Sequence, residues 1–280
     1  MATAPDDPMS DPIEIDTSVA HAARMYDYLL GGTTNFDVDR EAAIRQAEAS
    51  GGMENARYGV QAIRDFLGRS VRLLAGELGV RQFLDLGTGI PNGNNVHGVA
   101  QATNPESRIV YVDDDPIVLA HAHALLTSTP AGHTDFLQAD LREPEVILGE
   151  AARIIDFDEP VAVILMSMLH YLGDDEDPGA IVDTLMAGVP PGSYLLLSHL
   201  STDIQERMEG LVRSAEENPN TAYRFVMRSH AEILEYFHGL ELVEPGLVPI
   251  DEWRPDVPPP DVYPPGIQKP PSYGGLARKA

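Results

Sequence analysis

Three acidic side chains follow three short apolar runs, in a pattern that could bind a nucleoside. Asp85 lies two residues before the first glycine of the stretch FLDLGTGIP, Asp113 follows VYV, and Asp140 follows FLQA. Carboxylates at the ends of parallel strands can accept hydrogen bonds from a ligand, and paired glycines let the backbone approach it closely. The three segments therefore predict one ligand-binding edge.

The glycine loop distinguishes two kinds of cofactor. A dinucleotide-binding loop has the pattern G-x-G-x-x-G, but the third position counted from Gly87 and Gly89 is Asn92. A carboxylate at Asp85 would repel a pyrophosphate and attract the ammonium group of S-adenosylmethionine, which carries no phosphate. The backbone of Gly87, Thr88 and Gly89 would then contact that cofactor. An ordinary tight turn between a strand and a helix would give the same sequence pattern.

The second acidic cluster, VDDDP, is placed to bind a ribose. Asp113 lies 24 residues beyond Gly89, and a carboxylate there can accept hydrogen bonds from both ribose hydroxyls. NAD-binding folds use the same device, so this feature alone does not separate the two cofactors. Asp114 would face the adenine, and Asp115, directly before Pro116, would cap the next helix.

The third segment, LQADLRE, completes a possible adenine site. The carboxylate of Asp140 could accept a hydrogen bond from the adenine amino group, while the amide of Leu141 bonds a ring nitrogen. An Asp in an ordinary strand-ending turn would give the same sequence.

Two further segments offer groups for catalysis. The stretch MSMLHYL supplies His170 and Tyr171, and a later apolar run ends at His199. A general base is needed only if the reacting group of a substrate must lose a proton, and a histidine at either place could instead bond a backbone carbonyl. The histidines show no metal-ligand spacing and the chain has no cysteine, so no metal is predicted.

The elements that must position these residues alternate between strands and helices. Short apolar runs begin at Arg81 and continue to about Ile250, separated by helical segments, which indicates a mostly parallel sheet with helices on both faces. We expect four parts: a disordered segment 1–15, a helical cap at 16–80, the sheet domain at 81–253, and an extended proline-rich arm at 254–280 that packs on the domain. The arm has too many prolines for ordinary helix or sheet.

Composition limits the partners. The 280 residues include 19 Lys and Arg against 44 Asp and Glu, a formal charge of −25 that disfavours nucleic acid. The acidic N-terminus does not look like a signal peptide, and no apolar run approaches the roughly 20 residues of a membrane span. We expect a cytoplasmic protein with no membrane or nucleic-acid partner; the sequence leaves its oligomeric state open, a homodimer included.

These motifs together resemble a known family. FLDLGTGIP, VYVDDDP, LQADLRE and VILMSMLHYL resemble class I S-adenosylmethionine-dependent methyltransferases. AARMYDYLLGGTTNFDVDRE, with QFLDLGTGIP and LLLSHL, is similar to a bacterial methyltransferase family long catalogued as a domain of unknown function. Pro91 departs from the wider superfamily and agrees with this narrower group.

The resemblance implies a Rossmann-like fold with a seven-stranded sheet, S-adenosylmethionine as cofactor, and an N-terminal lid over the pocket. It places further residues in the site, some near the cofactor and others around the acceptor. Arg24 would hold the cofactor carboxylate, although packing in a short helix is an alternative for this segment. The other residues implied by the resemblance are Tyr26, Ser167 and Met168 beside the cofactor, and Asn35, Phe36 and Tyr171 in the acceptor pocket.

Three hypotheses follow. The first is methyl transfer to a small molecule by in-line displacement, for which the segment SMLHYL resembles small-molecule methyltransferases. The second is a cofactor-binding regulatory protein without turnover. The third is an NAD(P)-dependent oxidoreductase, which the missing third glycine, Asp85 and the lack of a Tyr-x-x-x-Lys pair disfavour.

Overall fold

The centre of the molecule is an eight-stranded sheet. The computed structural model describes residues 16–91, 95–125, 128–206, 208–218 and 223–280; the disorder expected for residues 1–15 lies outside this part. The strand order is β3-β2-β1-β4-β5-β8-β6, and β7 pairs with β8. The bounds are β1 (Gln82–Leu86), β2 (Arg108–Asp113), β3 (His133–Gln138), β4 (Val161–Met166), β5 (Tyr194–Leu200), β6 (Glu241–Leu242), β7 (Val248–Pro249) and β8 (Ser272–Arg278).

Strands β1 to β5 pair in parallel, as the alternation of elements predicts. Successive residues of a strand point to opposite faces, so each strand contributes to two apolar clusters. On one face, Phe83 packs with α3, α4 and α5; on the other, Leu84 packs with α6, α7 and α9. The helices are α3 (Met53–Ala75), α4 (Val96–Thr103), α5 (Pro116–Leu125), α6 (Pro144–Ala151), α7 (Pro178–Ala187) and α9 (His230–Glu235).

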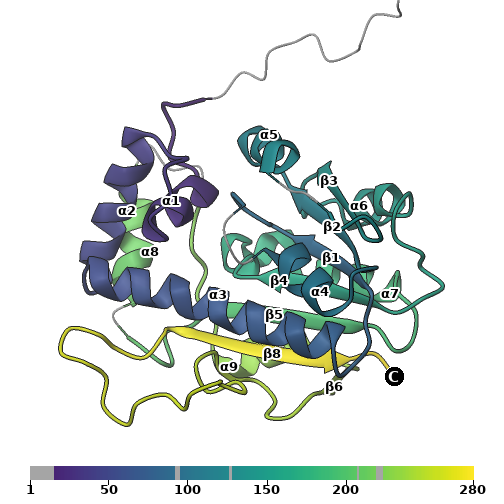
Figure 1. The fold of residues 1–280 in the computed structure, drawn as a ribbon. Coiled ribbons are helices and arrows are strands. Elements are labelled where there is room, and N and C mark those ends of the chain that lie inside the picture. Colours follow the sequence, from purple (N-terminus) through teal and green to yellow (C-terminus); the bar gives the residue numbers. More distant parts are fainter. Residues whose placement is uncertain (1–15, 92–94, 126–127, 207, 219–222) are drawn as a thin grey trace, which may run out of the picture.

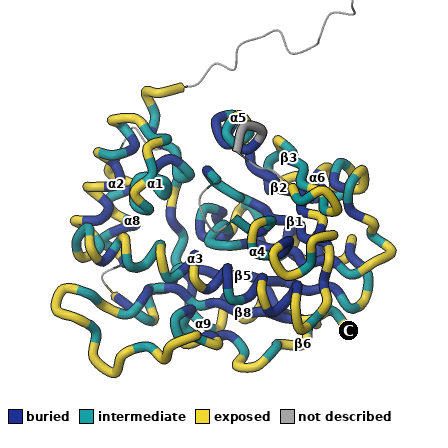
Figure 2. The backbone as a smooth tube through the Cα atoms, viewed as in Figure 1, coloured by how far each residue is buried: buried dark blue, intermediate teal, exposed yellow. Residues whose placement is uncertain are grey.

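Three other helices form a cap beyond the carboxyl ends of the parallel strands. They are α1 (Ala22–Leu29), α2 (Asp37–Ala49) and α8 (Met208–Glu216), and they lie together at one side of the sheet (Figure 1). Their apolar residues form two small clusters of their own, separate from the sheet core. Figure 2 shows the central strands β1, β2, β4 and β5 largely buried, while exposed residues recur along α2 and α8 of the cap.

The cap differs in two ways from the one expected at residues 16–80. It includes α8, which follows β5 in the sequence. Helix α3 was expected to be part of the cap, but its second half, from Ile63 to Ala75, packs on the sheet. In the described part of the chain, no helix is both long and apolar enough to cross a membrane.

The C-terminal segment is the main correction to the predicted fold. The proline-rich arm was expected to pack on the domain without forming ordinary sheet, but its last residues form β8, which lies between β5 and β6 and runs antiparallel to β5. The prolines end at Pro271, immediately before the strand. Glycine is required within it: a Cβ at Gly274 would come within 2.6 Å of the Phe66 ring. With the two-residue β7, this strand raises the strand number to eight where seven were expected.

Candidate active site

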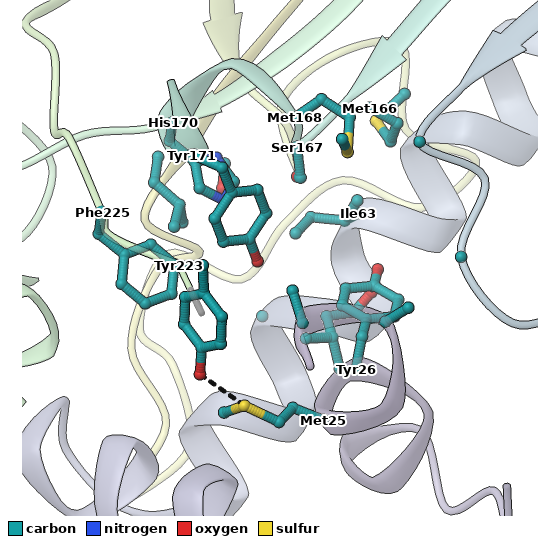
Figure 3. Close-up of a pocket in the computed structure, with 18 of the residues that line it drawn as sticks. Met25, Tyr26, Ile63, Met166, Ser167, Met168, His170, Tyr171, Tyr223 and Phe225 are labelled. Carbon is teal, nitrogen blue, oxygen red and sulfur yellow. Dashed lines mark hydrogen bonds between the residues drawn. The ribbon is translucent and has the colours of Figure 1, made fainter. Parts of the chain in front are cut away.

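One cavity joins the strand ends to the cap. Its volume is about 730 Å³, within the range of small-molecule sites. Its floor is formed by the residues that follow β1, β2, β3 and β4. Its walls come from α1, the first half of α3, the segment around Tyr223, and residues 268–272 before β8. Segments from the beginning, middle and end of the chain therefore meet at one place (Figure 3).

The loop after β1 lies on the cavity floor, as the motif predicts. Gly87 and Gly89 adopt positive φ angles of 71° and 66°, which favour glycine. A side chain at Gly87 would also collide with Met168. Thr88 Oγ1 donates a hydrogen bond of 3.0 Å to the Asp85 carbonyl, which tightens the turn.

Asp85 is buried beneath this loop and lines the cavity. Burial raises the pKa of its carboxyl group to about 7, against the opposing effect of the nearby Arg64 guanidinium. A buried carboxylate of this kind is stabilised by a cationic partner.

The carboxylate of Asp113 anchors the same loop. One of its oxygens accepts a hydrogen bond of 2.8 Å from the Gly89 amide, and the other accepts one of 3.1 Å from the Asp115 amide. Burial raises the pKa of Asp113 despite these two donors. Asp114 is exposed at the cavity. Asp115 caps α5 as predicted, because its side chain accepts a bond of 2.8 Å from the Ile117 amide.

Asp140 and Leu141 lie at the end of β3 and line the cavity. Asp140 accepts hydrogen bonds from the Arg142 backbone amide and guanidinium, at 2.9 and 3.1 Å. Arg142 also donates to Glu176, at 2.6 Å, and Arg224 donates to the other oxygen of Glu176, at 2.7 Å. A hydrogen bond from the Gly173 amide, together with these two arginines, lowers the pKa of the Glu176 carboxyl group to about 2.

The turn after β4 faces the glycine loop. Ser167 has a positive φ of 58°, which is uncommon for a residue with a side chain. Its amide donates a hydrogen bond of 3.1 Å to Ser198 Oγ on β5. This turn directs Met168 against Gly87, so the two predicted loops are in direct contact, and both Ser167 and Met168 line the cavity.

Aromatic residues surround the part of the cavity opposite the strand ends. Tyr171, Tyr223 and Phe225 form a cluster with ring centroids 5.3 to 5.7 Å apart. Tyr26 projects from α1 on the other side, and its hydroxyl donates to the Val60 carbonyl at 3.1 Å. Met25 Sδ accepts a hydrogen bond from the Tyr223 hydroxyl at 2.6 Å (Figure 3).

The two histidines proposed as bases differ in their position relative to the cavity, although their ring centroids are 5.6 Å apart. His170 lines the cavity, and burial lowers its pKa well below the usual value, with further lowering by His199 and Arg228. His199 is buried outside the cavity wall. Its Nδ1 lies 2.7 Å from the Leu200 carbonyl and its Nε2 lies 3.2 Å from Arg228 Nη1. His199 is therefore a structural residue, as its alternative interpretation holds.

Three residues implied by the resemblance lie outside the cavity wall. Arg24 faces away, where its guanidinium lies 3.2 Å from the buried Asp39 and donates to the Asp16 and Val19 carbonyls. Asn35 bonds Asp27 and the Gly32 carbonyl. Phe36 is 36% exposed, with the Arg24 guanidinium 5.3 Å from its ring centroid. These contacts lie within the cap, and in this structure Arg24, Asn35 and Phe36 do not line the cavity.

Sequence reasoning also missed residues that do line the cavity. Arg64 lies on the buried face of α3, where periodicity suggested only apolar packing. Tyr223, Arg224 and Phe225 follow α8 and belong to no recognisable motif. The C-terminal contribution is residues 268–272. Arg64 could have been identified, because it is an arginine among the apolar positions of α3. The other two segments carry no sequence pattern that points to the cavity.

The strand order, the acidic strand ends and the enclosed cavity define a class I methyltransferase fold. The sequence matches the S-adenosyl methyltransferase family over residues 8–280, and the chain belongs to that family. It is an S-adenosylmethionine-dependent methyltransferase.

Solved structures agree. A DUF574 family protein from Streptomyces avermitilis is 39% identical with a TM-score of 0.88, over 95% of this chain and all of that one. A putative methyltransferase from Thermobifida fusca is 40% identical with a TM-score of 0.84, over 94% and 96% of the two chains. The plantazolicin methyltransferase BamL, 11% identical with a TM-score of 0.50, shares the fold over 92% and 95%. No curated protein matches the sequence.

Proposed function

We propose that the protein transfers the methyl group of S-adenosylmethionine to a small molecule held between the strand ends and the cap. The observation that carries this proposal is one continuous cavity, which is acidic at the strand ends and aromatic beneath the cap. A site of this volume, enclosed by several segments, suits a cofactor and a small acceptor together.

The residues present fit the amino-acid end of the cofactor. Asp85 offers a buried carboxylate for the ammonium group, and Arg64 lies near enough to lower the pKa of Asp85 by its charge. An arginine can bind a carboxylate through two parallel hydrogen bonds. Both side chains line the cavity, so Arg64 takes the role that sequence reasoning gave to Arg24.

The nucleoside part of the cofactor fits Asp113 and the residues that follow β3. Each oxygen of Asp113 accepts one backbone hydrogen bond, and a carboxylate oxygen can accept a second one. Asp113 can therefore bind ribose hydroxyls without releasing the glycine loop. Asp140 and the Leu141 amide border the place expected for adenine, with Asp114 at the edge.

The protein contributes mainly orientation and the exclusion of water. When bound, S-adenosylmethionine supplies an electrophilic methyl carbon, which the acceptor atom attacks as sulfur leaves with the bonding electrons. The aromatic wall, Met168 and the cap enclose the acceptor against the strand ends, and such positioning can supply much of the rate. His170 serves here as an uncharged hydrogen-bonding group, because a positive imidazole would be buried near Arg228.

Two measurements test the proposal. Calorimetry should show that S-adenosylmethionine and S-adenosylhomocysteine bind to the purified protein while NAD does not. Mass spectrometry of incubations with S-adenosylmethionine and a panel of hydroxylated and amino aromatic compounds should detect S-adenosylhomocysteine together with a product heavier by one methylene. Binding of NAD alone would refute the cofactor assignment. Transfer only to proteins or nucleic acids would refute the small-molecule acceptor.

A further inference from the structure

The aromatic part of the cavity has the properties of a specific binding site. Its rings come from α1, from η1 (Leu169–Tyr171) and from the segment after α8. His170 lies against the cluster, 4.4 Å from the Tyr171 ring and 5.6 Å from the Phe225 ring between centroids. Met25, Met168 and Met208 line the same cavity. Aromatic and thioether groups of this kind pack favourably against the faces and edges of another ring.

The ionisable side chains in this wall are uncharged at neutral pH. Burial raises the pKa of Tyr26, Tyr171 and Tyr223 far above neutrality. Burial also lowers the pKa of His170, as described above. A charged ligand group placed among these side chains would lose its hydration and gain no opposite charge.

The charged side chains of the cavity lie elsewhere and have partners. Glu176 bridges Arg142 and Arg224, and Lys269 pairs with Glu252. Arg64 and the acidic residues of the strand ends belong to the part assigned to the cofactor. Charge is therefore concentrated on the cofactor side and in the paired groups.

The Tyr171 hydroxyl is a polar group of the aromatic wall that is available to a ligand. The Tyr171 hydroxyl points into the cavity, toward the space between Ile63 and Tyr223 (Figure 3). It makes no hydrogen bond with the residues that the structure describes. By contrast, the Tyr26 hydroxyl bonds Val60, and the Tyr223 hydroxyl bonds both Gln46 and Met25.

We propose that the acceptor is an uncharged planar aromatic molecule with a hydroxyl group, whose ring packs against Tyr223 and Phe225 while the hydroxyl bonds Tyr171. This inference rests on the proposed function, because it assigns the chemical class of the acceptor at the same site. The acceptor would be recognised by contacts with aromatic rings and by one hydrogen bond. Acceptors that carry a charge in this part of the cavity are excluded.

Calorimetry on the intact protein saturated with S-adenosylhomocysteine tests the class of acceptor. The probes are 2-naphthol, 2-naphthoate and 2-naphthylmethylammonium, which share a ring system and differ in charge. We expect 2-naphthol to bind at least about tenfold more tightly than either ion, because each ion must be desolvated without a partner. Equal or tighter binding of either ion, or no binding of 2-naphthol, would overturn the proposal.

The same titration separates this inference from the proposed function. S-adenosylhomocysteine is titrated first, and failure to bind would overturn the cofactor site and with it both proposals. Binding of S-adenosylhomocysteine followed by failure of 2-naphthol would overturn only the acceptor class. Displacement of S-adenosylhomocysteine by 2-naphthol would also contradict it, because the two ligands are assigned to different parts of the cavity.

Two variants locate the probe. Tyr171→Phe should weaken 2-naphthol about five- to tenfold through the lost hydrogen bond and leave naphthalene unchanged. Phe225→Leu should weaken both probes about fivefold through lost ring contacts. Phe36→Leu, the same substitution outside the cavity, should change neither. All three should bind S-adenosylhomocysteine like the wild type, which shows that they are folded; equal effects of Phe225→Leu and Phe36→Leu would refute the location.

Discussion

Asp85 is predicted to reduce the stability of the protein while enabling cofactor binding. Its carboxyl group is buried, and the nearby Arg64 guanidinium only partly offsets the effect of burial on its pKa. In Asp85→Asn the side chain keeps its shape and remains uncharged at every pH. We therefore expect the variant without ligand to be more stable than the wild type at alkaline pH, and to bind S-adenosylhomocysteine more weakly.

The magnitude follows from the pKa of Asp85, which rises from 3.8 to about 7 on folding. This difference corresponds to about 4 kcal/mol of unfolding free energy. The folded protein holds the Asp85 proton more tightly than the unfolded chain does. The contribution of this proton to the unfolding free energy is therefore fully present below pH 3.8 and is lost as pH rises to about 7. Removing the charged hydrogen bond to the cofactor should cost about 2 kcal/mol, or roughly 30-fold in Kd.

Urea unfolding at pH 4.5 and pH 8 measures the first effect, and calorimetry with S-adenosylhomocysteine at pH 8 measures the second. The stability difference between variant and wild type should be several-fold larger at pH 8. Asp65→Asn, on the exposed face of the same helix as Arg64, is the control and should show neither effect. An Asp85→Asn variant that is less stable at pH 8, or that binds the ligand like the wild type, would refute the reasoning.

Three further predictions concern the remaining site residues. Asp113→Ala should weaken S-adenosylhomocysteine at least about tenfold, since it removes both the ribose acceptor and the anchor of the Gly89 amide; unchanged affinity by calorimetry would exclude that role. Arg24→Met should lower the unfolding free energy by about 3–5 kcal/mol, because it leaves the buried Asp39 without its cation, yet the folded variant should bind the ligand normally. The His170 imidazole should titrate well below the ordinary histidine pKa in an NMR titration, because its burial disfavours the charged form, with its signal assigned through His170→Gln; titration near 6.5 would contradict the assigned environment.

The parallel sheet could be predicted because its strands carry strong local signals. The runs around Phe83, Ile109 and Ile164 are continuous and apolar, as strands buried on both faces must be. Strand β8 could not be predicted in the same way. Its sequence, SYGGLAR, is short and rich in glycine, and its place depends on Phe66, which packs closely over Gly274. A contact between residues so far apart in the chain leaves no local pattern.

The residues of the candidate site also fall into those that the sequence could predict and those that it could not. Asp85, Asp113 and Asp140 could be found because each lies at or near the carboxyl end of a strand, and parallel strands bring their carboxyl ends together. Arg24 was misplaced because the sequence does not show which side of a short helix faces the cavity. The Tyr223 segment was missed because its position depends on contacts across the cap, such as the hydrogen bond from Gln46.

The distribution of charge in the cavity follows from these two kinds of wall. Strand ends leave backbone groups and carboxylates available to a polar ligand. The cap consists of short helices whose inner faces must be apolar to pack on one another, and the Tyr223 hydroxyl beside them already bonds Gln46 and Met25. Under the proposed function, the cofactor is recognised by groups that the sheet fixes in place. The proposed acceptor contacts lie instead on η1 and on residues that follow α8, so a change of acceptor would require substitutions there while the acidic residues of the strand ends stay the same.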